Sequence, residues 1–201
     1  MKTVITGGAG FIGSHLTDYL LAVGDSVTVL DDFSTGSRDN LATAMEHRRF
    51  HLVEGSVLDR HLVTGIVAGA DRVIHLAAAV GVRRIIEQPL RSLQVNLGGT
   101  ENVLEAALSA HATMLLASTS EIYGKNTADK LSEDSDRILG DPLLSRWTYA
   151  AAKGIDEAFA HAYWRQFGLQ VAIVRLFNTV GPPDRPLRNG GAQPGRPGAA
   201  Q

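Results

Sequence analysis

A cluster of glycines near the start of the chain constrains the fold more than any other feature. Residues 4–6 have the apolar, β-branched pattern of a strand, residues 7–13 read Gly-Gly-Ala-Gly-Phe-Ile-Gly, and residues 11–23 have helical spacing of apolar side chains. The glycines fit both the G-x-G-x-x-G and the G-x-x-G-x-x-G spacing. Glycines allow a tight turn and let another group approach the backbone closely. We therefore expect a strand, a tight turn and a helix in immediate succession.

Apolar runs alternate with helical stretches along the rest of the chain. Strands are expected at residues 4–6, 27–30, 50–53, 72–76, 114–117 and 171–176, and helices at residues 11–23, 40–46, 90–110 and 149–167. Strands separated by helices form a parallel sheet that is covered on both faces. The sequence therefore predicts an α/β protein with a Rossmann-type, doubly wound parallel sheet in residues 1–181.

The composition excludes several classes of protein. The 201 residues include 19 Lys and Arg, 21 Asp and Glu, and no cysteine. The charge forms no basic stripe for nucleic acid, and no apolar run approaches the ~18 residues that cross a membrane. Without cysteine there are no disulfides and no thiol chemistry. Because Met1 leads directly into the first strand pattern, we expect no signal peptide and a cytoplasmic location.

An acidic residue ends the second strand pattern. Asp31 lies 18 residues beyond Gly13. A carboxylate there can accept hydrogen bonds from a ribose 2′-hydroxyl and would repel a 2′-phosphate, while a pyrophosphate would be stabilised at the N-terminus of the helix that follows the glycines. The sequence therefore predicts a dinucleotide site that prefers NAD to NADP.

Tyr149 and Lys153 are set four residues apart in Tyr-Ala-Ala-Ala-Lys, and they follow a polar cluster at residues 118–121. On a helix, positions i and i+4 share a face, so the ammonium would lie beneath the phenol. A nearby positive charge lowers the pKa of a tyrosine from its usual ~10, and such a phenol can take a proton from a sugar hydroxyl near neutral pH. The alternative interpretation is an exposed helix face that carries both residues.

As an ordered set, these features resemble the extended short-chain dehydrogenase/reductase family of nucleotide-sugar epimerases, dehydratases and decarboxylases. The resemblance covers about residues 1–181 and implies NAD as cofactor and a nucleotide-sugar substrate. Its motifs are the glycine turn with Ser14-His15-Leu16, Asp31-Asp32-Phe33, Gly55-Ser56-Val57, His75-Leu76-Ala77-Ala78, Asn96-Leu97-Gly98-Gly99-Thr100, residues 118–124, Tyr149 with Lys153, and Asn178-Thr179-Val180-Gly181-Pro182.

The resemblance implies roles for the matching residues. Thr119 would hydrogen-bond the sugar 4-hydroxyl, Tyr149 would deprotonate it as hydride moves from C4 to NAD⁺, and Lys153 would hold the nicotinamide ribose. Ser120 and Asn178 would also contact the substrate. Ser56 stands where the family commonly has Asp, so the adenine contact there would be altered. The remaining cofactor contacts would come from Gly7, Gly10, Phe11, Ile12, Gly13, Asp31, Asp32, Val57, Leu76, Ala77, Ala78 and Asn96.

The cluster Thr119-Ser120-Glu121 bears on the reaction. Glu121 matches the Glu of dehydratases and decarboxylases, and Ser120 replaces the Asp acid of the dTDP-glucose type. The cluster is similar to that of UDP-glucuronate decarboxylases and GDP-mannose 4,6-dehydratases. The wider context, residues 78–82 and 145–149, is more similar to bacterial UDP-glucose 4-epimerases. We therefore expect a UDP-sugar 4-epimerase, with a decarboxylase, a 4,6-dehydratase or a catalytically inactive NAD-binding fragment as alternatives. A further alternative is that Glu121 is only a solvated loop carboxylate.

A metal site is not expected. His47 and His51 are at i and i+4, but Arg48 and Arg49 between them disfavour a cation, and His51 is expected in a strand.

The segment 182–201 differs in composition from the rest. It is rich in Pro and Gly and has almost no apolar side chains, so we expect it to be disordered. Family members usually continue into a C-terminal lobe that binds the substrate, and this lobe is largely missing. One hypothesis is a frameshift at Pro182 or Pro183, because permissible codons read one base later can encode Gln-Thr-Gly-Arg-Tyr-Gly-Met-Val-Val-Pro; the other is a naturally divergent terminus. The resemblance also implies a homodimer through the helices from Leu90 to Ala110 and from Tyr149 to Phe167.

Overall fold

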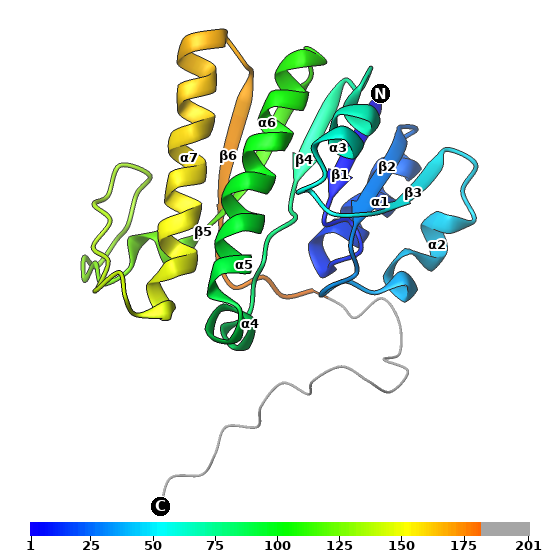
Figure 1. The fold of residues 1–201 in the computed structure, drawn as a ribbon. Helices are drawn as coiled ribbons and strands as arrows, with labels where there is room; N and C mark the ends of the chain where they lie inside the picture. The colour runs from blue at the N-terminus through cyan, green and yellow to red at the C-terminus, as the bar shows by residue number, and fades with distance from the viewer. Residues whose placement is uncertain (182–201) are drawn as a thin grey trace, which may run out of the picture.

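Six parallel strands form one sheet in the order β3-β2-β1-β4-β5-β6 (Figure 1). The strands are β1 (Lys2–Thr6), β2 (Ser26–Asp31), β3 (Phe50–Glu54), β4 (Arg72–His75), β5 (Thr113–Thr119) and β6 (Val171–Leu176). This is the doubly wound order, so the predicted fold is confirmed. The computed structural model describes residues 1–181, apart from the side chains of residues 82–84. The expected tail and the frameshift hypothesis fall outside the described residues.

Helices cover both faces of the sheet (Figure 1). One face packs against α1 (Phe11–Ala22) and α2 (Ala42–Met45), and the other against α3 (Arg60–Val67), α6 (Gly99–Ser109) and α7 (Thr148–Phe167). Short elements connect them: α4 (Val82–Glu87), α5 (Pro89–Leu93), the 3-10 turns η1 (Arg38–Leu41), η3 (Ser120–Tyr123) and η4 (Ser145–Trp147), and a π-helical turn, η2 (Gln94–Gly98).

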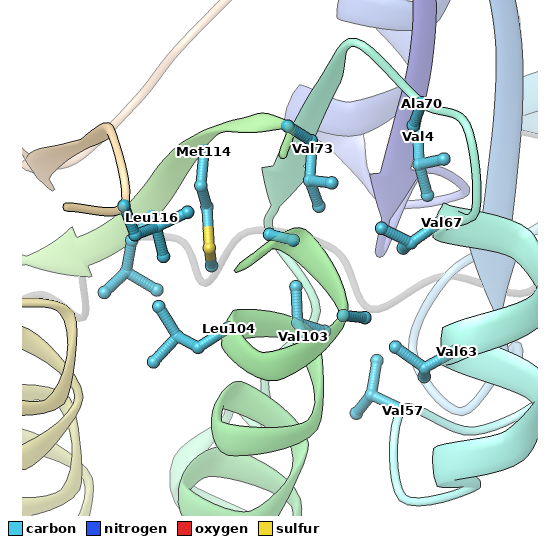
Figure 2. Close-up of a cluster of buried hydrophobic side chains, with 14 of the residues drawn as sticks. Val4, Val57, Val63, Val67, Ala70, Val73, Val103, Leu104, Met114 and Leu116 are labelled. Carbon is cyan, nitrogen blue, oxygen red and sulfur yellow. The ribbon is translucent and has the colours of Figure 1, made fainter. Parts of the chain in front are cut away.

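The alternation of side chains along the strands creates two cores. Val4 and Val73 belong to the core beneath α3, α6 and α7, whereas their neighbours Ile5 and Ile74 belong to the core beneath α1 and α2. Figure 2 shows the first of these cores, where Leu104 of α6 lies on the side of Met114 and Leu116 of β5, and the adjacent Val103 lies on the side of α3. Because both faces are buried, the strands read as near-continuous apolar runs in the sequence.

The helices differ from the sequence-based expectation in three places, and one of them is α4, which was not expected. α3 was not expected; its N-terminus is capped by Asp59, whose side chain accepts a hydrogen bond from the backbone N of Leu62 at 3.0 Å. The helix expected at residues 90–110 is present as α5 and α6, but η2 interrupts it with a wider turn. A single π turn of this kind is frequent at functional sites.

The first core offers a direct test with two leucines. Leu104→Ala removes a side chain that is 0% exposed, so the free energy of unfolding should fall by about 2–5 kcal/mol. Leu90→Ala, on a side chain that is 67% exposed, should change it by less than about 0.5 kcal/mol. Urea unfolding followed by circular dichroism measures both. Equal losses in the two variants would contradict this assignment of the core.

Candidate active site

A cavity of about 1080 Å³ opens beyond the carboxyl ends of the strands. It lies where the strand order reverses, since β1 pairs with β2 on one side and with β4 on the other. In open parallel sheets, ligands bind at this switch point. The lining runs from the turn after β1 to the ends of β5 and β6, so one cavity joins the glycine turn to the polar cluster.

The glycine turn is closed tightly against both neighbouring strands. The backbone N of Gly7 donates to the carbonyl O of Leu30 at 2.8 Å, and Gly7 has a φ of 72°. A Cβ at Gly7 would lie 2.6 Å from the backbone N of Ala77, and a Cβ at Gly13 would lie 2.5 Å from the carbonyl O of Gly7. α1 starts directly afterwards with no side-chain cap. Its first N–H groups therefore have no intrahelical partner and suit an anionic ligand.

Asp31 stabilises this turn while it also lines the cavity. Its Oδ2 accepts a hydrogen bond from the backbone N of Ala9 and its Oδ1 one from the backbone N of Phe33, both at 2.9 Å. Burial raises the pKa of Asp31, and the charge of the neighbouring Asp32 adds to the rise, while the two N–H groups oppose it. The carboxyl group is thus held at the end of β2, where a ribose hydroxyl could reach it.

Three of the expected cofactor residues, Ser56, Asn96 and Lys153, lie outside the cavity lining. Ser56 accepts a hydrogen bond from the backbone N of Leu58 at 3.2 Å and so closes its own turn, whereas the adjacent Val57 lines the cavity. Asn96, in η2, is 1% exposed, and its Oδ1 accepts a hydrogen bond from the backbone N of Ala79 at 2.8 Å. Asn96 therefore acts indirectly by fixing the loop after β4, which itself lines the cavity.

Thr119, Glu121 and Tyr149 lie together at the far side of the cavity. The Oγ1 of Thr119 accepts a hydrogen bond from the backbone N of Glu121 at 3.2 Å, which starts η3, and Ser120 is outside the lining. Burial, together with the negative charges of Glu121 and Asp156, raises the pKa of Tyr149 to about 12. At neutral pH the Tyr149 side chain is therefore a neutral phenol.

The expectation that Lys153 lowers the pKa of Tyr149 is wrong for this structure. The Nζ of Lys153 donates to the Oδ2 of Asp156 at 2.8 Å, and the two side chains are 2% and 0% exposed. Lys153 lies outside the cavity lining. The spacing of four residues correctly places Lys153 on the same helix face as Tyr149. It does not reveal that Asp156, one turn further along the helix, binds the ammonium group of Lys153.

Buried polar side chains extend from this ion pair to β1. His75 is 1% exposed; its Nδ1 is 2.6 Å from the Oγ1 of Thr6 and its Nε2 is 3.1 Å from the Oγ1 of Thr100. The Thr100 hydroxyl lies beside Asp156 and lowers the pKa of that carboxyl group, which burial raises. Burial lowers the pKa of His75 to about 3, and the charge of Lys153 contributes, so the imidazole is neutral at pH 7.

Most of the expected site residues do meet in the cavity. Those that line it are Gly7, Gly10, Phe11, Ile12, Gly13, Asp31, Asp32, Val57, Leu76, Ala77, Ala78, Thr119, Glu121, Tyr149 and Asn178. The sequence analysis did not predict that Gln88 and Arg91 line the cavity. They belong to no motif in the sequence, and they reach the cavity because of where α4 and α5 lie in the folded chain. Trp147 also lines the cavity; an aromatic residue directly before the Tyr149 helix was a signal that could have been used.

Comparisons with known proteins agree with this geometry. The sequence model of the GDP-mannose 4,6 dehydratase family matches residues 4–187. A UDP-N-acetyl-alpha-D-glucosaminuronate decarboxylase from Bacillus cytotoxicus is 40% identical over 181 residues. The chain belongs to the NAD-dependent epimerase/dehydratase family, the extended short-chain dehydrogenase/reductases.

Solved structures of other family members superpose well. A UDP-N-acetylglucosamine 4-epimerase from Methanobrevibacter ruminantium, in complex with UDP-N-acetylmuramic acid, has a TM-score of 0.82 at 30% identity over 90% of this chain. A dTDP-glucose 4,6-dehydratase from Streptomyces venezuelae, solved with NAD bound, has a TM-score of 0.78 at 34% identity over 87% of this chain. The match to the Bacillus decarboxylase includes 90% of this chain but only 55% of the decarboxylase. Likewise, this chain spans 56% of the Methanobrevibacter epimerase chain and 55% of the Streptomyces dehydratase chain.

Two further observations limit the kinds of site present. Within residues 1–181, no group of three or more His, Cys, Asp or Glu side chains is placed to hold a metal ion. The described helices include none that combines the length and the apolar character of a membrane span.

The buried His75 predicts a pH dependence of stability. Its folded-state pKa of about 3 lies below the ordinary 6.5, so the unfolded chain binds a proton that the folded chain does not. This contribution is fully present above about pH 6.5, and the free energy of unfolding should fall by up to roughly 1.4 kcal/mol per pH unit from there toward pH 4. In His75→Gln that slope should be smaller.

Urea unfolding at a series of pH values measures the slope. His61→Gln, on the exposed face of α3, is the matched control and should keep the slope of the unaltered chain. Asp31 and Asp156, whose pKa values are raised, contribute with the opposite sign in all three proteins, so their effect cancels in the comparison. The same slope in His75→Gln and in the unaltered chain would show that His75 is not the titrating group.

Proposed function

We propose that this chain is the dinucleotide-binding and proton-transfer part of an enzyme that modifies nucleotide-sugars by transient oxidation of the sugar C4. The observation that carries the proposal is the single cavity that joins the glycine turn to Thr119, Glu121 and Tyr149. Oxidation of an alcohol needs one acceptor for the hydroxyl proton and another for the hydride that leaves the carbon. In this cavity the proton acceptor would be on the side of Tyr149, and the hydride acceptor would be bound on the side of the glycine turn.

The residues present fit NAD as the hydride acceptor. The turn at Gly7 and Gly13 leaves no room for side chains, so its backbone can approach a pyrophosphate, and the open N–H groups of α1 favour the negative charge. The carboxyl group of Asp31 lies at the end of β2, at the position that suits a ribose hydroxyl. When bound, NAD⁺ supplies the site that receives the hydride.

The chain's own residues would handle the proton. Thr119 Oγ1 would orient the sugar 4-hydroxyl. Tyr149 would first release its own phenolic proton to solvent, and the resulting tyrosinate would accept the proton of the sugar hydroxyl as the C4 hydride departs. Asn178, at the end of β6, lines the cavity on the same side and would contact the substrate. Glu121 lines the same cavity and its charge raises the pKa of Tyr149, so we expect it to act on the sugar carbons next to C4.

Among the reactions that begin with a C4 ketone, decarboxylation of a UDP-uronate is the best supported. The Bacillus decarboxylase is 40% identical to this chain, whereas the Methanobrevibacter epimerase is 30% identical. Glu121 lines the cavity beside Tyr149, as a decarboxylase or dehydratase would need. This reverses the preference for a 4-epimerase that the wider sequence context gave. A 4-epimerase is the second candidate, favoured by the TM-score of 0.82.

Two expectations about the whole protein stay proposals. A homodimer through α5, α6 and α7 is consistent with the exposed apolar side chains of Leu90, Ile155 and Trp164, which are 67%, 45% and 50% exposed. A cytoplasmic location is the second proposal, and the lack of cysteine is what supports it.

Cofactor binding can be tested without turnover. Calorimetry should show NAD⁺ binding at least about tenfold tighter than NADP⁺, because the Asp31 carboxylate would repel a 2′-phosphate. Gly7→Ala should abolish binding, because its Cβ would lie 2.6 Å from the backbone N of Ala77. Gly65→Ala is the matched control: its Cβ would meet nothing within 4 Å, and binding should persist. Equal affinity for the two dinucleotides would contradict the role of Asp31.

The reaction can be identified from the mass of the product. Incubated with NAD⁺ and UDP-uronates, the chain should release carbon dioxide. Tyr149→Phe should lower the rate at least about 100-fold, and Tyr19→Phe, on an exposed α1 side chain, should not. A UDP-hexose isomer of unchanged mass would instead identify a 4-epimerase. No product despite NAD⁺ binding would reject turnover by this chain and leave an inactive NAD-binding fragment.

A further inference from the structure

A buried carboxylate that the proposed reaction does not use lies next to Lys153. The Oδ2 of Asp156 is 2.8 Å from the Nζ of Lys153, and both side chains are almost fully buried. The other oxygen, Oδ1, accepts no well-formed hydrogen bond among the described residues, although the Thr100 hydroxyl lies beside this carboxyl group. Since the two residues are at i and i+3 on α7, the helix itself presents the carboxylate to the ammonium.

The other charged groups around this pair do not compete for the ammonium. Glu157, the next residue on α7, accepts two hydrogen bonds from Arg175 of β6, at 3.0 and 2.8 Å. Glu121 of η3 is exposed and lies near the tyrosine. His75 of β4, which reaches the carboxylate through a threonine hydroxyl of α6, is neutral. The ammonium therefore has one buried, charged partner.

Lys153 has two candidate partners on its own helix, and they differ in charge. Tyr149, four residues earlier, is a neutral phenol at pH 7, whereas Asp156 offers a full negative charge at hydrogen-bond distance. In a buried site the attraction between opposite charges is much stronger than that between a charge and a neutral group. Breaking a buried ion pair also leaves a charge without a partner, which is strongly destabilising.

We propose that Asp156 is a positioning residue that holds the Lys153 ammonium away from Tyr149, so that the lysine reaches the tyrosine or a ligand in the cavity only by leaving this ion pair. The proposal takes from the proposed function only the identity of the proton-accepting tyrosine. Its test needs neither dinucleotide nor sugar, so the two can fail separately.

The test is a double-variant cycle on the ionisation of Tyr149 in the full chain. The chain has four tyrosines, and subtracting the ultraviolet titration of a Tyr149→Phe partner isolates the tyrosinate signal of Tyr149. In Asp156→Asn the ammonium is released toward the phenol, so ionisation should begin at least about one pH unit lower, a tenfold change in the ionisation constant. Asp129→Asn, on an exposed loop, should leave the titration unchanged.

The second arm separates positioning by Asp156 from the mere loss of its charge. Lys153→Met should raise the pKa of Tyr149 by at least about one unit when added to Asp156→Asn, a background in which its removal leaves no carboxylate without a partner. If Lys153→Met leaves the pKa of Tyr149 in Asp156→Asn unchanged, the released ammonium never reaches the phenol, and the proposal is wrong.

The unaltered chain provides a check that does not depend on the folding of any Asp156 variant. With the ammonium held by Asp156, Tyr149 should show no tyrosinate up to about pH 11. Tyrosinate from Tyr149 below about pH 10 would show that Lys153, or another cation, already stabilises the anion, and would overturn the proposal.

Discussion

The close approach of the turn after β1 to the loop after β4 is the constraint on which the site depends. β1 lies between β2 and β4, and its carboxyl end passes directly into a turn whose backbone is bonded to β2 and pressed against Ala77. No side chain fits between these backbones at Gly7 or Gly13. The polar backbone therefore forms one wall of the cavity, and the end of β5 forms the other. In a longer or bulkier turn, α1 would start elsewhere and its open N–H groups would not face the cavity.

The strands were predictable because both faces of the sheet are buried, which turns each strand into a short apolar run. The helices were less predictable from the sequence than the strands. α3 lies over the sheet through Val63 and Val67, but Gly65 and its β-branched residues lower the helical signal, and only the Asp59 cap marks its start. The π turn contains Asn96, whose side chain accepts a hydrogen bond from the backbone N of Ala79, a residue that is distant in sequence. Local patterns contain no information on such a contact.

The same limit applies to the site. Motif spacing located the glycine turn, Asp31 and Tyr149, since each of these depends on a local strand, turn or helix. It did not show which polar residues would face inward. Ser120 follows Thr119 directly but lies outside the cavity lining, because η3 turns the chain there. Lys153 shares a helix face with Tyr149, yet Asp156 binds its ammonium. A helix position determines the neighbours that a side chain has, and their charges decide which of them it binds.

The charges around Tyr149 have a consequence for the proposed chemistry. Burial and the two carboxylates, Glu121 and Asp156, oppose ionisation, and the positive charge of Lys153 is compensated by Asp156. A base in this environment needs a positive charge that these side chains do not supply to it. In the proposed reaction that charge belongs to the oxidised nicotinamide, which the cavity would bring opposite the phenol. The tyrosine could then lose its own proton, and so become able to accept one from the sugar, only when the hydride acceptor is in place. Both parts of the oxidation would thus depend on the same binding event.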